Sequence, residues 1–369
     1  MNQHQVIAPG AVLGILGDGQ LGKMIAIAAA QMGYKVAVLG PGGRESPAGH
    51  VAYWAKAWGA NSSVSEELLD EFCTLVSVVM IEWENIPVAL VERIEAKGVR
   101  VRPGSKVLAV AQDRLLEKKC AEKLGIPVPF YRNVDNPAQD ASTALKDCIL
   151  KTRRNGYDGK GQVRISAGDP ISAAWRTLDN VPCVLEEVVD FACEVSVIVA
   201  RKPTSPDSCE QFVTYGTFEN IHVNGILHST HYPPRDDSIP SMFGVEDVAI
   251  DAATQLAEAL DVHGLLAVEF FVTKNGRILF NEMAPRPHNS GHLTIECCVT
   301  SQFTQYVRAA CNLPFGSVEF HSHGTMHNII GTDADKWPEY ADRYPVALHL
   351  YGKGDAKPGR KMGHFTDYC

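Results

Sequence analysis

The sequence predicts a mixed α/β and α+β protein with a doubly wound N-terminal domain and a central antiparallel sheet. Short apolar strands alternate with helices over residues 12–101, which is typical of a parallel sheet covered on both faces. A small α+β lobe over about 130–187 surrounds a glycine-rich loop. Two later strands flank Lys274-Asn275-Gly276, a hairpin signal. We expect domains over 1–111, 112–190 and 191–369, the second beginning with a linker helix and the third ending in a C-terminal extension.

Composition restricts the class of protein. The 369 residues are 45% apolar and 21% charged, and a net charge of −9 without a basic block argues against a nucleic-acid partner. Ten cysteines without C-x-x-C spacing favour a reducing compartment. The N-terminus has no apolar signal core, and no run reaches the roughly 18 apolar residues of a membrane helix. We therefore expect a cytoplasmic protein with no membrane partner.

The N-terminal domain opens on the outline of a dinucleotide-binding unit. A strand over Val12–Leu16 runs into the motif G-D-G-Q-L-G at 17–22, followed by a helix over Lys23–Met32 and a strand over Val36–Leu39. A nicotinamide enzyme usually has Asp or Glu at the end of the second strand, but here a glycine-rich turn, 40–43, follows it. We therefore expect the first glycines to shape a tight turn and a pocket for a small anion or substrate.

Two glutamates follow a later strand of this domain. Glu82 and Glu84 lie after Val78–Ile81, at the carboxyl end of a strand, where doubly wound sheets bind their ligands. Helix-capping or solvated carboxylates are an equally open interpretation. The remaining expected elements are a helix over Glu66–Leu75, a helix beginning at Pro87 and a strand over Val99–Val101.

A basic, glycine-rich loop, Lys151–Gln162, dominates the second domain. After a helix over Gln112–Leu124, we expect a strand, a helix, this loop, a strand near Val163, a helix near Ala173 and a strand at Val184-Leu185. Three glycines let main-chain N–H groups face an anion, so the loop suits a polyphosphate. It is not a P-loop, because no Lys-Ser or Lys-Thr pair closes it, and a solvated surface turn is the alternative.

The third domain carries long strands and a polar loop. His222 is expected in a turn over Glu219–Gly225, and the loop Met283–His292 is rich in Arg, His and Asn, as an anion-handling loop would be. The expected strands are Phe191–Arg201, Phe212–Phe218, Ile226–Tyr232, Leu265–Val272 and Arg277–Asn281, and the expected helices are Val245–Leu260 and Thr294–Ala310.

Two carboxylates of the hairpin predict a cation site. Glu269 and Glu282 lie on its two strands and can face the same side, and Asn281 completes an oxygen-only set of the kind that Mg²⁺ prefers. A salt-bridged or exposed pair is the alternative, but a glutamate within the apolar run 265–271 is difficult to expose. Together with the glycine loop, the set predicts a site for ATP with magnesium.

At this point the sequence resembles the ATP-grasp superfamily and, within it, the N5-carboxyaminoimidazole ribonucleotide synthetases of purine biosynthesis. The resemblance spans nearly the whole chain. It is carried by the motif at 17–22, Gln112-Asp113-Arg114, the loop 156–162, the run 281–292 and the tail 359–364. It implies a mobile lid formed by the lobe, Mg²⁺ (or Mn²⁺) as cofactor, and a homodimer.

The resemblance also implies a reaction. ATP, bicarbonate and 5-aminoimidazole ribonucleotide would give ADP, phosphate and the N5-carboxylated nucleotide through carboxyphosphate. Arg286, His288 and Asn289 would hold bicarbonate and carboxyphosphate, Asp158 would accept a proton from the amine, and Lys151 would assist phosphoryl transfer. Closure of the lid would exclude water, so we expect the loop to be mobile without ATP.

The resemblance places the two nucleotides at named positions. Residues expected around ATP and its cation are Arg114, Lys151, Gly156, Tyr157, Asp158, Gly159, Lys160, Gly161, Gln162, Glu186, Glu187, Val188, Val189, Glu194, His222, Glu269, Asn281 and Glu282. Residues expected around the ribonucleotide are Gln20, Leu21, Glu82, Tyr157, Asp158, Lys353 and Arg360, the last two at its 5′-phosphate.

Three other functions compete with this one. Another ATP-grasp ligase, biotin-carboxylase-like or formate-using, fits the Tyr157-Asp158 pair and the basic tail less well. A nicotinamide oxidoreductase lacks the acidic residue after the second strand. A non-catalytic nucleotide sensor would have no need for both metal carboxylates.

Overall fold

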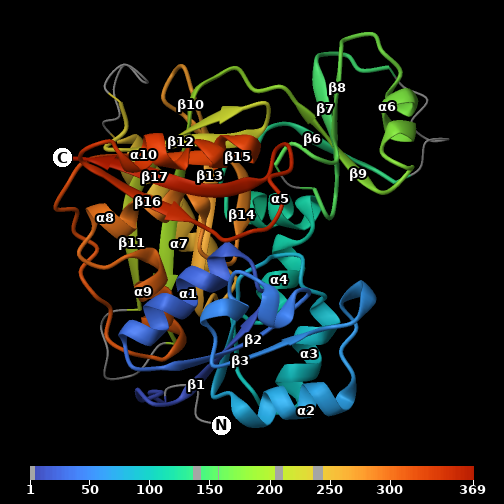
Figure 1. Cartoon of the computed structure of the whole chain (residues 1–369). Helices are drawn as coiled ribbons and strands as arrows, with labels where there is room; N and C mark the ends of the chain where they lie inside the picture. The colour runs from blue at the N-terminus through green and yellow to red at the C-terminus, as the bar shows by residue number, and fades with distance from the viewer. Residues whose placement is uncertain (1–4, 136–142, 157, 204–210, 236–243) are drawn as a thin grey trace.

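The computed structural model describes residues 5–135, 143–156, 158–203, 211–235 and 244–369. Within these ranges the strands form three sheets, of five, four and eight strands. In Figure 1 the five-stranded unit (blue) lies below the eight-stranded one, and the four-stranded lobe (green) projects to the upper right. The fold class expected from the sequence is confirmed.

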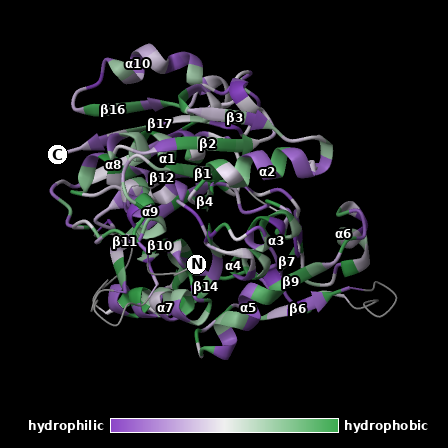
Figure 2. Ribbon diagram, turned by 90° about the horizontal axis from the view of Figure 1, so that it is seen from below, coloured by the Kyte–Doolittle hydropathy of each residue, from purple (hydrophilic) through white to green (hydrophobic). Residues whose placement is uncertain are grey.

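The first sheet is parallel, with strand order β3-β2-β1-β4-β5. Side chains alternate between its faces: Ile15 packs in a cluster with Ile25 of the first helix, whereas Leu16 packs in a cluster with Phe72. Both faces are therefore covered, and strand β2 is mostly apolar in Figure 2. The elements are β1 (Val12–Leu16), α1 (Gln20–Gln31), β2 (Lys35–Gly40), β3 (Trp54–Ala57), α2 (Glu66–Leu75), β4 (Val78–Ile81), α3 (Val88–Ala96), β5 (Val101–Arg102) and α4 (Ser105–Ala111).

Most of this domain agrees with the sequence-based expectation, but β5 begins two residues later than expected and three further elements differ. Helix α1 begins at Gln20, three residues before the expected start, because the glycine turn enters the helix directly. The edge strand β3 and the short helix α4 were not expected. A four-residue strand and a seven-residue helix are too short to show a clear hydrophobic period.

The lobe is an antiparallel sheet with strand order β6-β9-β7-β8, and helix α6 packs on it through its own small apolar cluster. The helix expected before the glycine loop would fall between 135 and 147, of which 136–142 lie outside the described residues. The elements here are α5 (Arg114–Lys123), β6 (Tyr131–Val134), β7 (Cys148–Thr152), β8 (Gln162–Ile165), α6 (Ile171–Thr177) and β9 (Cys183–Glu187).

The third sheet is antiparallel, with strand order β14-β13-β10-β11-β12-β15-β17-β16. One apolar cluster joins it to helix α7, and another includes both Ile25 of α1 and Tyr306 of α9, so the first and third sheets share a core. The elements are β10 (Phe191–Arg201), β11 (Phe212–Val223), β12 (Ile226–Tyr232), α7 (Val245–Ala259), β13 (Gly264–Thr273), β14 (Ile278–Ala284), α8 (Thr294–Cys297), α9 (Gln302–Ala310), β15 (Gly324–Ile330), α10 (Trp337–Ala341), β16 (Val346–Leu350) and β17 (Lys361–Tyr368).

Two expectations for this domain were wrong. His222 lies on β11 rather than in a turn, because the strand continues to Val223. The single helix expected over Thr294–Ala310 is two helices, since Cys298 is extended and the Ser301 side chain caps α9 by accepting from the Thr304 N–H. No helix in the described ranges is long and apolar enough to span a membrane.

Candidate active site

A cavity of about 650 Å³ lies where the three sheets meet. It collects side chains from the ends of the first sheet, the lobe, the β13–β14 hairpin and the segment before β17, which are far apart in the sequence. The expected site residues that line it are Gln20, Leu21, Glu82, Arg114, Gly156, Asp158, Lys160, Glu269, Glu282, Arg286, His288, Asn289, Lys353 and Arg360.

Glu82 caps the N-terminus of α1. Its carboxylate accepts hydrogen bonds from the N–H groups of Gly19 (3.0 Å) and Gly22 (3.1 Å), where the helix dipole favours a negative charge. Gly17 has φ +95°, and a Cβ there would lie 2.6 Å from Glu82. An internal carboxylate thus fills the place that a pyrophosphate takes in dinucleotide-binding proteins. This geometry argues against a nicotinamide cofactor, and it confirms the capping interpretation of Glu82.

Asp18 explains the glycine-rich turn after β2. Its carboxylate accepts from the N–H groups of Gly42 (2.6 Å) and Gly43 (2.9 Å). A Cβ on Gly40 would lie 2.5 Å from the Asp18 side chain. The turn is therefore built around an internal carboxylate and is not a phosphate loop.

The two hairpin glutamates face each other. Glu269 and Glu282 are paired across β13 and β14, at a register shift; Glu269 is buried, whereas the Glu282 side chain is 40% exposed toward the cavity. Asn281 lies in this irregularity, and its buried Oδ1 has no hydrogen-bond partner among the described residues. Two carboxylates and an unpaired amide oxygen are the donors that Mg²⁺ prefers, so these residues fit the expected cation.

Arg114 decides which carboxylate of the pair is charged. Its guanidinium lies 2.8 Å from Glu282, and this attraction outweighs burial and lowers the pKa of Glu282. Burial raises the pKa of Glu269, and the charge of Glu282 adds to the rise. A divalent cation would remove this repulsion.

His222 and Glu194 form an ion pair beside Glu269. The His222 Nδ1 lies 3.2 Å from the Glu194 carboxylate, and one ligand atom from each of Glu194, His222 and Glu269 lies within 4.8 Å of the other two. Burial opposes protonation of His222, but the Glu194 carboxylate outweighs it and raises the pKa of His222 to about 9. Glu194 and His222 do not line the cavity themselves, but they contact Glu269, which does.

The His222–Glu194 pair predicts a pH-dependent stability. Because the pKa of His222 rises from 6.5 to about 9 on folding, the pair stabilises the protein fully below pH 6.5 and loses this effect as the pH rises through 9. The difference in unfolding free energy between wild type and Glu194→Gln should therefore shrink between these pH values. Urea unfolding over this range measures it. The exposed control Glu258→Gln should show a flat difference, and a flat profile for Glu194→Gln would contradict the pairing.

A second ion cluster lies behind the cavity. Glu186 is buried, and its carboxylate lies 2.9 Å from the Lys151 ammonium and 3.3 Å from that of Lys118. The two lysines outweigh burial and lower the pKa of Glu186 to about 2. Lys118 was not among the expected site residues, although Arg114, Glu117 and Lys118 have the i, i+3, i+4 spacing that places side chains on one helix face.

The expected adenine hinge is partly occupied by internal contacts. The N–H of Glu187 donates to the Phe130 carbonyl (3.0 Å), and the N–H of Val188 donates to that of Asp147 (3.2 Å). Adenine would therefore have to be recognised by the remaining main-chain groups of Glu187 to Val189.

The glycine loop reaches the cavity through Gly156, Asp158 and Lys160. Gly159 and Gly161 have positive φ, and a Cβ on Gly159 would lie 3.1 Å from the Asn224 carbonyl oxygen in the β11–β12 turn. The Asp158 carboxylate lies 2.7 Å from the Lys361 ammonium.

Four of the expected loop residues that the structure describes, Lys151, Gly159, Gly161 and Gln162, do not line the cavity. Gln162 begins β8 and is exposed. Tyr157 lies outside the described residues.

The polar loop after β14 supplies three groups. The Arg286 guanidinium is paired with Glu84, whose pKa it lowers in spite of burial. The His288 Nε2 lies 3.3 Å from Glu269, and burial, together with the Arg286 charge, lowers the pKa of His288 to about 3. Asn289 Oδ1 accepts from the Asn328 amide (2.6 Å). The loop therefore presents a fixed cation and a neutral imidazole to the cavity.

Four cations surround one end of the cavity. The expected Lys353 and Arg360 are joined there by Lys357 and Lys361, which were not expected. Lys353 donates to the Lys361 carbonyl (2.9 Å), and burial together with the charge of Arg360 lowers its pKa to about 8. Such a cluster suits a phosphate dianion.

Comparison with known proteins agrees with this geometry. Residues 11–112 match a ribonucleotide synthetase preATP-grasp domain, 119–303 an ATP-grasp domain and 324–368 a phosphoribosylaminoimidazole carboxylase C-terminal domain. N5-carboxyaminoimidazole ribonucleotide synthase of Bacillus subtilis (strain 168) is 40% identical over 98% of this chain and 92% of its own.

Solved structures are also similar. The ADP complex of an N5-carboxyaminoimidazole ribonucleotide synthetase superposes with a TM-score of 0.88 at 38% identity, covering 100% of this chain and 94% of that one. The Aspergillus clavatus enzyme in complex with ADP and 5-aminoimidazole ribonucleotide superposes with a TM-score of 0.83 at 28% identity, covering 100% and 94%. The chain belongs to the N5-carboxyaminoimidazole ribonucleotide synthase family of ATP-grasp enzymes.

Proposed function

We propose that the chain carboxylates 5-aminoimidazole ribonucleotide with bicarbonate and ATP, giving N5-carboxyaminoimidazole ribonucleotide, ADP and phosphate, as a step of purine biosynthesis. One observation carries the proposal: a single cavity holds a pair of cation-binding carboxylates, a paired arginine beside a neutral histidine, and a basic cluster. These three parts correspond to ATP, bicarbonate and a phosphorylated nucleotide.

Glu269, Glu282 and Asn281 would hold Mg²⁺ (or Mn²⁺), which supplies charge neutralisation at the phosphates when it is bound. Lys151, Arg114 and the main-chain groups of Gly156 to Gln162 neutralise and position the rest of the polyphosphate. Glu194 and His222 hold the ribose end of ATP. Lys118 shares Glu186 with Lys151, so it helps to hold that carboxylate beside Lys151.

Arg286 orients bicarbonate for phosphorylation. Its guanidinium offers forked donors to a carboxylate, and Glu84 holds it in place. Asn289 is fixed by Asn328 and contributes an amide to the same anion. His288 is neutral, so it accepts or donates one hydrogen bond without adding charge. Carboxyphosphate then forms in contact with the Arg286 guanidinium.

The ribonucleotide lies at the other end of the cavity. Lys353 and Arg360 bind its 5′-phosphate, and Gln20, Leu21 and Glu82 line the space for its base. Asp158 accepts the proton of the amine. The Lys361 ammonium lies 2.7 Å from this carboxylate and fixes its position, and closure of the glycine loop over the cavity excludes water.

The test is ADP release with each co-substrate omitted in turn. ADP formation should need bicarbonate and rise sharply with 5-aminoimidazole ribonucleotide. Turnover indifferent to that nucleotide would refute the proposal in favour of another ATP-grasp ligase. Binding of ATP without any turnover would favour a nucleotide sensor.

Lys353→Ala should raise the KM for the ribonucleotide by about tenfold with a smaller effect on kcat, because one charged contact to the phosphate is worth about 1.5–3 kcal/mol. Steady-state kinetics with varied ribonucleotide measures this. Lys336→Ala, which removes an exposed lysine paired with Asp333, is the control. An unchanged KM would remove Lys353 from the phosphate site.

The protein is proposed to act in the cytoplasm as a homodimer, with domains over 1–111, 112–190 and 191–369. The nine cysteines that the structure describes are free thiols, which supports a reducing compartment. Light scattering on the purified protein tests the dimer.

A further inference from the structure

A second group of possible metal ligands lies away from the ATP site. It consists of Glu296 on α8, His349 on β16 and His364 on β17, and one ligand atom from each lies within 4.8 Å of the other two. The two histidines are direct cross-strand partners, and their rings stack with centroids 4.6 Å apart at 14°. None of the three lines the active-site cavity, and no step proposed above uses them.

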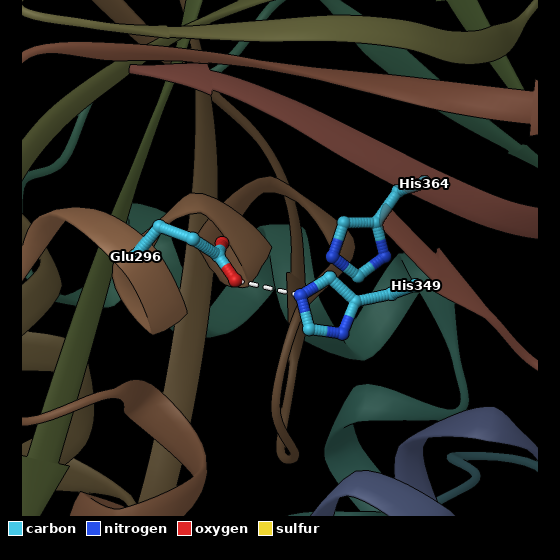
Figure 3. A group of neighbouring side chains, drawn as sticks. All are labelled: Glu296, His349 and His364. Carbon is cyan, nitrogen blue, oxygen red and sulfur yellow. Dashed lines mark hydrogen bonds and ion pairs between the residues drawn. The ribbon is translucent and has the colours of Figure 1, made fainter. Parts of the chain in front are cut away.

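The ring nitrogens of the two histidines have different hydrogen-bond partners. The His349 Nε2 lies 2.6 Å from a Glu296 oxygen, and the His364 Nδ1 lies 2.9 Å from the Tyr351 hydroxyl. Figure 3 shows one nitrogen of each stacked ring facing the Glu296 carboxylate. His364 is fully buried, yet its Nε2 has no hydrogen-bond partner among the described residues, and the same is true of Glu296 Oε2.

A buried, unpaired imidazole nitrogen beside an unpaired carboxylate oxygen is costly unless something binds both. We propose that Glu296, His349 and His364 bind one divalent transition-metal cation of the Zn²⁺ type. Two imidazoles and one carboxylate are a known donor set for zinc, with the fourth position left to water. Mg²⁺ prefers oxygen ligands, so this site differs in chemistry from the Glu269–Glu282 pair.

The surroundings prepare the histidines to bind a metal. Burial keeps the pKa of His364 well below its usual value, so the ring is neutral, as a metal ligand must be. When Nδ1–H donates to the Tyr351 oxygen, the lone pair of Nε2 is free. The side chain of His349 is 32% exposed, which gives a cation access from solvent.

The cation would fasten the C-terminal hairpin to α8. Strands β16 and β17 flank the segment that carries Lys353, Lys357 and Arg360 into the cavity, and Lys361 begins β17. A bound metal would thus help to hold in place the segment that carries the basic cluster. The binding itself does not depend on the proposed reaction, so the two can fail separately.

The test is a titration of untagged, chelator-treated protein with Zn²⁺ by calorimetry and with Co²⁺ by visible absorption, in excess Mg²⁺ to occupy the carboxylate pair. Wild type should bind one equivalent of Zn²⁺, and the Co²⁺ form should show the strong visible bands of a low-coordinate site. His349→Gln should weaken binding by at least about tenfold, since even an outer-shell partner is worth that much. Glu296→Gln is a second variant at the same site.

His327→Gln is the matched control. His327 also pairs with a carboxylate, Asp367 at 3.2 Å, and its side chain is 29% exposed, but among the described residues no third ligand completes a group with it. Circular dichroism establishes that each variant is folded. His222→Gln tests the other ligand group, Glu194, His222 and Glu269. Absence of a bound equivalent in wild type, unchanged binding in His349→Gln, or loss of binding in His222→Gln would each overturn the proposal.

Discussion

Replacing Glu282 with glutamine is expected to lower kcat by about 10³-fold or more, since the electrostatic role of a catalytic cation is worth several kcal/mol and about 4 kcal/mol corresponds to that factor. Glu282 is the carboxylate of the hairpin pair that Arg114 keeps ionised, so it is the stronger anionic ligand. Glutamine keeps the shape and leaves an oxygen for Arg114. The change therefore acts on the cation and not on packing.

The effect should depend on Mg²⁺ in a characteristic way. Kinetics at rising Mg²⁺ should show a higher concentration for half-maximal activity in Glu282→Gln, and circular dichroism should show an unchanged fold. Glu258→Gln removes an exposed glutamate of α7 and should behave as wild type. Near-normal turnover of Glu282→Gln would remove the hairpin pair from the cation site.

The fold was predictable where hydrophobic period and length were clear. Strands β4, β10 and β12 and helix α2 have the bounds expected from the sequence, because each is an apolar or amphipathic run with polar or turn residues at its ends. The two helices in place of one after the polar loop were not recognised. The Ser-x-x-Thr cap at Ser301 was visible in the sequence but lies inside an otherwise helical pattern.

The residue types that form the candidate site could be predicted from the sequence, but most of the contacts between them could not. The sequence indicates that Glu269 and Glu282 can face one cation, because two strands joined by a short turn have a definite register. It offers helix capping as one role of Glu82 but does not indicate that the capped helix lies 60 residues earlier, or that Asp158 pairs with Lys361, 203 positions later. Pairings of this kind are set by how the three sheets pack.

For Arg286, too, the sequence predicts the role of the residue but not its contact. The sequence identifies it as an anion-binding residue, and the structure adds that Glu84 holds its guanidinium. Both side chains lie at the cavity, and neither is more than 21% exposed. Replacement by alanine would leave Glu84 enclosed without its partner, a change that costs about 3–5 kcal/mol for buried pairs and would confuse catalysis with stability. Lysine keeps the charge and removes only the fork.

Arg286→Lys is therefore expected to lower the rate of carboxylation by about 10²-fold. A loss of this size is typical when an enzyme loses one preorganised hydrogen-bond donor that stabilises charge developing in the transition state. A lysine cannot hold a planar anion at two oxygens, so carboxyphosphate would be poorly retained. ADP release should then fall less than product formation. Measuring both in one reaction gives this ratio, and Arg277→Lys, in the exposed turn of the hairpin, is the control. If ADP and product fall together in Arg286→Lys, the residue acts before carboxyphosphate forms, and retention of the intermediate must come from the lid.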